Sequence, residues 1–191
     1  MIDPIATTIA LVALVVSGYQ AWWTLLRRGE VRMTLPTFVS FSYDVTKRTQ
    51  PSIEPKIFFR TLFYGAGRRG LALDNVFLSL TLDGVCHEFS VWGYGDDKLV
   101  RGSGLFVGET GVVSNHHFTL PESPDFRFTQ GEYILEVFAS TVGKRLRRIC
   151  VATLTVSGED GPAFVKEAPD VAYWFQREPH SSRYRGSLER P

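Results

Sequence analysis

A stretch of 22 residues without a charged side chain, residues 5–26, constrains the fold of this chain more than any other feature. As an α-helix at about 1.5 Å per residue it would be about 33 Å long, enough to cross the hydrocarbon core of a bilayer. Asp3 is placed to cap such a helix, and Pro4 suits its first position, where the missing N–H is not needed. We therefore expect residues 1–28 to form a transmembrane anchor that meets the lipid bilayer through residues 5–26.

Two other interpretations compete with the anchor. A cleaved signal peptide would begin with a basic region and would carry small residues before its cleavage site. Here the preceding residues are acidic, and no Ala-x-Ala pattern precedes Tyr19 or Trp22. A buried core helix is less consistent, because so many uncharged residues stand together at the terminus.

The charges beside the anchor predict its orientation. Asp3 precedes the apolar segment, and three arginines follow it: Arg27, Arg28 and Arg32. Positively charged flanks are retained on the cytoplasmic side, and tryptophans such as Trp22 and Trp23 prefer the headgroup level. We expect a single-pass protein of the cell membrane with its C-terminal domain in the cytoplasm.

The residues after the anchor alternate apolar and polar side chains in short segments. Such segments, with turns about every eight to twelve residues, predict a mainly β fold, an antiparallel β-sandwich, over residues 31–157. From Gly158 onward, glycine, proline, serine and arginine become frequent. We expect residues 158–191 to form a mostly disordered tail, with an aromatic patch at residues 171–175 as its one ordered candidate.

One segment, residues 129–137, resembles the approach to strand F of immunoglobulin-like sandwiches; it reads Thr-Gln-Gly-Glu-Tyr-Ile-Leu-Glu-Val. The resemblance gives Tyr133 the role of the tyrosine whose hydroxyl bonds back to the backbone upstream. Leu135 stands where antibody domains place a cysteine, so true antibody-type domains are excluded. Residues 59–82 also resemble the strand–turn–strand of membrane-tethered bacterial sandwiches of unassigned function. The resemblance covers residues 31–156 at fold level and implies no particular function.

Several function classes find little support. The formal net charge of +1 gives no reason to expect a nucleic acid partner. Alternation places Cys150 on the core face and Cys86 outward, which disfavours a disulfide and suits a reducing compartment. A zinc or hydrolytic enzyme would need Glu109 to converge with His116 and His117, which point to opposite faces of a strand. We expect no enzyme and no cofactor.

Basic residues cluster at the expected turn between the last two strands of the sandwich. A solvated hairpin end is one interpretation of this cluster, and contact with anionic lipid headgroups is the other. The linker between anchor and first strand is only four residues, 27–30, so the turn can reach the bilayer. The candidate membrane contacts are Trp22, Trp23, Arg27, Arg28, Lys144, Arg145, Arg147 and Arg148.

The outward faces of the same two strands are more apolar than a solvated sandwich face should be. Either the aromatic patch folds back over them as an extra strand or plug, or a protein partner or second copy docks there. The candidate partner surface comprises Ile134, Phe138, Ile149, Val151, Tyr173, Trp174 and Phe175.

These features predict a non-catalytic scaffold, or a module that recruits a partner, at the inner membrane surface. The alternative is an extracytoplasmic sandwich, tethered to the membrane, that binds a ligand or solute. Mapping the topology of the chain separates the two.

Overall fold

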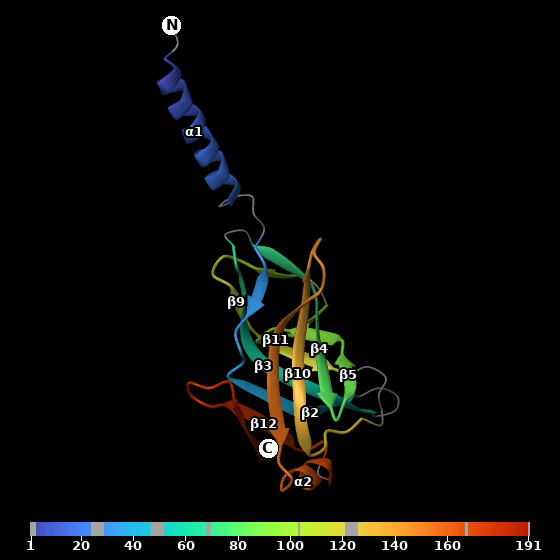
Figure 1. Cartoon of the computed structure of the whole chain (residues 1–191). Coiled ribbons are helices and arrows are strands. Elements are labelled where there is room, and N and C mark those ends of the chain that lie inside the picture. Colours follow the sequence, from blue (N-terminus) through green and yellow to red (C-terminus); the bar gives the residue numbers. More distant parts are fainter. Residues whose placement is uncertain are drawn as a thin grey trace.

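The computed structural model has one apolar helix followed by a β-domain, and the helix projects from one end of that domain (Figure 1). It describes residues 3–23, 29–46, 52–67, 70–102, 104–120, 126–166 and 168–190. The elements are α1 (Pro4–Ala21), β1 (Val31–Met33), β2 (Phe38–Thr46), β3 (Ser52–Gly65), β4 (Leu71–Leu82), β5 (Val85–Phe89), β6 (Val91–Tyr94), β7 (Val100–Arg101), β8 (Leu105–Val107), β9 (Val112–Thr119), β10 (Gly131–Thr141), β11 (Arg147–Val156), α2 (Gly161–Lys166), β12 (Ala172–Arg177) and β13 (Tyr184–Glu189).

The helix α1 is long and apolar enough to cross a membrane. Its 18 residues span about 27 Å at 1.5 Å each, and none of them is buried. Asp3 caps it as expected, because its Oδ1 accepts a hydrogen bond of 2.9 Å from the Ile5 N–H. The expected span continued to residue 26; residues 24–28, with Arg27 and Arg28, lie outside the described residues.

The strands form two antiparallel sheets arranged as a sandwich, which confirms the predicted fold class. In the first sheet the order is β13-β12-β2-β3-β9-β6-β7, with β1 also paired to β3. In the second sheet the order is β11-β10-β4-β5, with β8 also paired to β4. The tight hairpin at Asp83–Gly84 joins β4 to β5, and both residues have the positive φ that this turn type requires.

Aromatic rings fill the space between the sheets. The ring of Phe41 on β2 lies 4.5 Å from that of Phe128, 5.3 Å from Tyr133 and 4.8 Å from Phe175, centroid to centroid. All four side chains are buried, so their packing ties both sheets and the segment before β10 into one core. Phe164 on α2 stacks on Phe128 at the same end of the sandwich.

The segment after residue 157 is ordered, so the expectation of a mostly disordered tail is wrong for its described residues. α2 follows the last strand of the second sheet, and β12 and β13 then extend the first sheet beside β2. Tyr173 and Phe175 alternate inward along β12 and are buried in the core. Their burial supplies the apolar contacts that a disordered tail would lack.

Tyr133 adopts the geometry that the immunoglobulin resemblance implied. Its hydroxyl donates to the Thr129 carbonyl at 2.7 Å and accepts from the Thr129 N–H at 2.7 Å. The two cysteines lie as alternation predicted: Cys86 is exposed on the outer face of the second sheet, and Cys150 is buried.

Candidate functional site

The turn between β10 and β11 lies against the chain that follows the anchor. Lys144 donates from its Nζ to the Gly29 carbonyl, and Arg147 forms an ion pair with Glu30. The Glu30 carbonyl in turn accepts a hydrogen bond of 2.8 Å from the Ala66 N–H, at the turn after β3. These contacts lie at the end of the sandwich at which the chain enters from α1 (Figure 1). We call it the membrane-facing end, after the membrane span expected for α1.

Gly29 is buried at this end, and its small size is required there. A Cβ at this position would lie 2.8 Å from both the Ala66 carbonyl carbon and the Gly67 nitrogen, closer than side-chain carbons approach backbone. Only glycine therefore lets the backbone at residue 29 lie this close to the backbone of Ala66 and Gly67. The first residues of the domain are fixed to the sandwich rather than acting as a loose tether.

Cationic side chains surround a hollow at the membrane-facing end. The hollow has a volume of about 330 Å³. It is lined by Glu30, Val31, Ala139, Thr141, Lys144, Arg145 and Arg147. Guanidinium groups beside a hollow suit phosphate or carboxylate groups, because they can donate two parallel hydrogen bonds to such oxygens.

Exposed apolar side chains accompany these cations. Val142 and Leu146, on the same turn, are 65% and 46% exposed, and Phe106 on β8 is 64% exposed. Phe106 belongs to this end because its ring lies over Gly70, at the start of β4. Exposed apolar side chains are unfavourable in water, and their free energy falls when they enter the boundary between lipid headgroups and acyl chains.

The predicted membrane contacts do not all lie together. Lys144, Arg145 and Arg147 lie at the membrane-facing end, where they line the hollow with Glu30. Arg148 instead turns to the outer face of the second sheet, where it pairs with Glu136. Trp22 and Trp23 are exposed at the C-terminal end of α1 and contact each other and Tyr19, while Arg27 and Arg28 lie outside the described residues.

Sequence reasoning missed the apolar members of this site. It named the cations of the turn but not Val142 and Leu146, which stand one on each side of Lys144 and Arg145. The sequence could have indicated them, because an apolar residue within a short, highly charged turn cannot be buried in the core and must be exposed. Phe106 had no such signal, because only pairing with β4 brings it to this end.

The predicted partner surface is only partly assembled. On the outer face of the second sheet, Ile134 and Val151 are 43% and 44% exposed, and Phe138 on β10 stacks on Phe77 of β4 at 5.1 Å. Ile149 is half-buried beside the irregularity at which β10 and β11 change register. We call Phe77, Ile134, Phe138 and Val151 the apolar face.

Tyr173, Trp174 and Phe175 do not belong to the apolar face. Tyr173 and Phe175 are buried in the core, and Trp174 lies on the outer side of the first sheet. β12 is an extra strand, as one interpretation held, but it pairs with β2 rather than folding over Ile134 and Val151. The expectation failed because strand spacing does not tell which sheet a late strand joins.

The outer side of the first sheet carries a row of aromatic side chains. The Phe38 ring lies 5.4 Å from Trp174 and 5.6 Å from Phe58, and the Phe58 ring lies 4.7 Å from His117. Ser40 is buried between Trp174 and Phe58, its partners across the strands. We call Phe38, Phe58, His117 and Trp174 the aromatic row.

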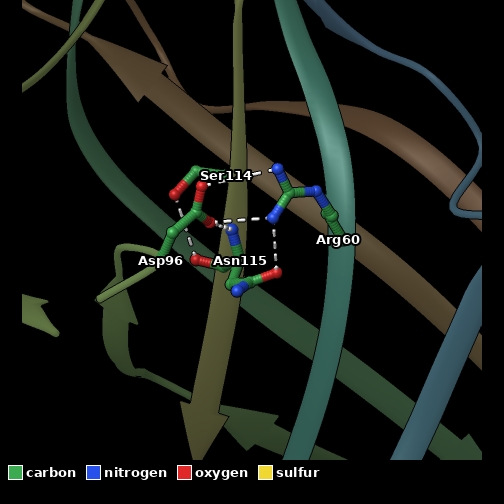
Figure 2. Close-up of polar contacts among 4 residues, drawn as sticks. All are labelled: Arg60, Asp96, Ser114 and Asn115. Carbon is green, nitrogen blue, oxygen red and sulfur yellow. Dashed lines mark hydrogen bonds and ion pairs between the residues drawn. The ribbon is translucent and has the colours of Figure 1, made fainter. Parts of the chain in front are cut away.

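A polar cluster borders this row on β3 and β9. Figure 2 shows Arg60 reaching Asp96, to which it donates at 2.9 Å and 3.4 Å, and Asn115, whose side-chain oxygen it reaches at 3.2 Å. Asp96 also accepts from the Asn115 N–H at 3.2 Å, and the Ser114 hydroxyl donates to the Asn115 carbonyl at 3.3 Å. The cluster fixes the loop after β6 onto the sheet.

The adjacent histidines face opposite sides of β9, as alternation predicted. His116 is buried among Phe59, Phe63 and Trp92, and Trp92 donates from Nε1 to His116 Nδ1 at 3.2 Å. Desolvation lowers the pKa of His116 to about 3, so the side chain is neutral with its proton on Nε2. Desolvation likewise lowers the pKa of His117 to about 4.

No metal centre forms in the part of the chain that the structure describes, since no three His, Cys, Asp or Glu side chains there are placed to hold an ion. Glu109 lies on the turn before β9, at the membrane-facing end, whereas His116 is in the core. Comparison with known proteins adds no assignment: no protein family and no curated protein matches the chain.

Proposed function

We propose that this protein is a single-pass, membrane-anchored sandwich that recruits or scaffolds a protein partner at the inner membrane surface, without catalysis. The observation that carries the proposal is the apolar face. Phe77 and Phe138 stack across β4 and β10, and Ile134 and Val151 stand exposed on the same face, with the Glu136–Arg148 ion pair among them. A sheet face open to water is normally polar, and several exposed apolar side chains on one face are typical of interaction surfaces.

We also propose that the sandwich is immunoglobulin-like. The order β2-β3-β9-β6 corresponds to strands A-B-E-D of such domains, and β11-β10-β4-β5 corresponds to G-F-C-C′. Tyr133 on β10 makes the tyrosine-corner hydrogen bond at the start of the strand equivalent to F. The added β12 and β13 extend the first sheet beyond the position of strand A.

The cytoplasmic orientation is supported by the arginines that follow the anchor in the sequence, Arg27, Arg28 and Arg32. It is also consistent with two unpaired cysteines, one of them exposed. Exposed Cys86 offers a direct test. A membrane-impermeant maleimide added to intact cells should leave it unlabelled, and permeabilising the cells should allow labelling. A Cys86→Ser variant is the control for any reaction at Cys150.

Partner recruitment is tested by a photocrosslinking residue in the full chain in its native membrane. Placed at Ile134, it should give a discrete adduct, and Val151→Glu should remove that adduct by putting a charge on the apolar face. Val165 on α2 is a matched control, because it is also an exposed aliphatic residue but does not belong to the apolar face. An absence of adducts at Ile134, or equal adducts at Val165, would overturn the proposal.

The aromatic row favours a second candidate, an extracytoplasmic sandwich that binds a ligand or solute. Four half-buried rings across adjacent strands form a surface on which a flat or apolar ligand can stack. Labelling of Cys86 in intact cells would favour this candidate over the first.

A further inference from the structure

We propose that the membrane-facing end of the sandwich binds an anionic phospholipid bilayer directly. In this arrangement Val142 and Leu146 enter the headgroup boundary, and the hollow beside Arg145 and Arg147 holds a lipid phosphate. The proposal goes beyond the anchor, which would hold the chain at any bilayer, and beyond partner recruitment on the apolar face. Three kinds of observation support it: distance, charge and the exposure of apolar side chains.

The first observation is distance. Gly29 is six residues after Trp23, the last described residue of the anchor region, so at most about 22 Å of extended chain separates them. Lys144 contacts Gly29 directly, and Arg147 pairs with Glu30. The turn between β10 and β11 is therefore held within about 22 Å of extended chain from the anchor region.

The second observation is charge. The turn places Lys144, Arg145 and Arg147 at this end, and the carboxylate paired with them is Glu30, so positive charge remains. Acidic Asp74 on β4 and Glu109 also lie at this end, and basic Arg32 on β1 offsets one of them. Juxtamembrane clusters of this sign are attracted to anionic leaflets.

The third observation is the pairing of these cations with exposed apolar side chains. Single exposed apolar residues are ordinary, but Val142 and Leu146 flank the cations within one turn, and Phe106 stands exposed at the same end. Apolar side chains that enter the acyl boundary, with cations at phosphate height, are the arrangement of interfacial binding segments. A hollow of about 330 Å³ between the cations is large enough for a phosphate group.

The test measures the depth of the turn in the full chain, reconstituted into vesicles in a Cys86→Ser background. An environment-sensitive fluorophore is attached at Val142→Cys or, as the control, at Val165→Cys on α2 at the opposite end of the sandwich (Figure 1). In phosphatidylcholine vesicles containing phosphatidylglycerol, a lipid-borne quencher should quench the label at 142 and not at 165. An aqueous quencher should show the reverse pattern.

The charge requirement is tested in the same vesicles. Arg145→Gln should reduce lipid quenching at position 142, and so should replacing the anionic lipid with phosphatidylcholine alone or adding salt. Lys166→Gln on α2 should change nothing. If the aqueous quencher reaches positions 142 and 165 equally, the turn does not enter the bilayer and the proposal fails.

Equal lipid quenching with and without phosphatidylglycerol would also overturn the proposal, because the anionic headgroup would then have no role. Neither result depends on the crosslink at Ile134. Failure of lipid binding and failure of partner recruitment can therefore be told apart.

Discussion

The interior of the sandwich and its membrane-facing end are built from different interactions. In the interior, Phe41, Phe128 and Tyr133 are buried ring against ring, and the hydroxyl groups of Tyr43 and Tyr133 bond to backbone. At the membrane-facing end, an exposed ion pair and a lysine–carbonyl contact hold the turn, and apolar side chains face outward.

The interior determines the stability of the fold, whereas the interactions at the membrane-facing end depend on salt and lipid. Buried aromatic contacts stabilise the fold whatever the salt or lipid, since water is already excluded from them. Exposed ion pairs contribute little to stability in water, and salt screens them. Exposed valine and leucine side chains contribute favourable free energy only when a bilayer covers them. We therefore expect substitutions in the interior to change unfolding and those at the end to change membrane contact.

The largest effect is expected from Phe128→Ala. Removing a buried ring that packs against Phe41, Tyr43 and Phe164 leaves a cavity, and should lower the free energy of unfolding by about 3–5 kcal/mol. Denaturant unfolding of the full chain in detergent micelles measures this change. Phe106→Ala removes an exposed ring of the same size, and should change the value by less than about 0.5 kcal/mol. Equal losses of unfolding free energy in the two variants would contradict the proposed difference between the interior and the membrane-facing end.

Acid should destabilise the interior through His116. Because burial lowers its pKa to about 3, the unfolded chain takes up a proton below pH 6.5 while the folded chain does not. The contribution of this histidine is thus complete above about pH 6.5 and is lost as the pH falls toward 3, by about 1.4 kcal/mol per pH unit. His116→Gln should make the fall in unfolding free energy shallower; an unchanged slope would contradict this.

A smaller loss is expected from Tyr133→Phe. The substitution keeps the ring in the core but removes both hydrogen bonds to Thr129, which should cost about 1–2 kcal/mol of unfolding free energy. Tyr64→Phe is the matched control, because among the described residues its hydroxyl has no hydrogen-bond partner. The prediction is wrong if the two variants unfold at the same denaturant concentration.

The smallest effect on stability is expected at the membrane-facing end, from Glu30→Gln. Glu30 and Arg147 are 51% and 62% exposed, so the loss of their ion pair should lower unfolding free energy by about 0.5 kcal/mol or less. High salt should remove even this difference. A loss above about 1 kcal/mol, measured in micelles, would mean that the end contributes to the fold as the interior does.

Local pattern was enough to predict the strands and the directions of many side chains. Asp3 and Pro4 marked the start of α1, Asp83–Gly84 marked a hairpin, and alternation separated His116 from His117 and Cys86 from Cys150. Each of these depends on neighbours in the chain. Periodicity and turn chemistry therefore suffice for them.

Long-range pairing could not be predicted in the same way. Tyr173 and Phe175 were expected to cover the outer face of the last two sandwich strands or to form part of a partner surface, yet pairing with β2 buries them beside Phe41. Likewise, the contacts of Gly29 and Phe106 depend on which turns meet at one end of the sandwich. The pattern of a single sequence does not specify such long-range contacts, because they join segments far apart in the chain.

The pairing of β12 with β2 has a consequence for how the protein is made. β2 leaves the ribosome early, but its partner arrives only when residues 172–177 have been synthesised. The apolar segment at residues 4–21 is available to the membrane long before then. The sandwich therefore closes long after the segment of α1 has been made. Until residues 172–177 arrive, the edge of β2 that pairs with β12 has no partner strand from this chain.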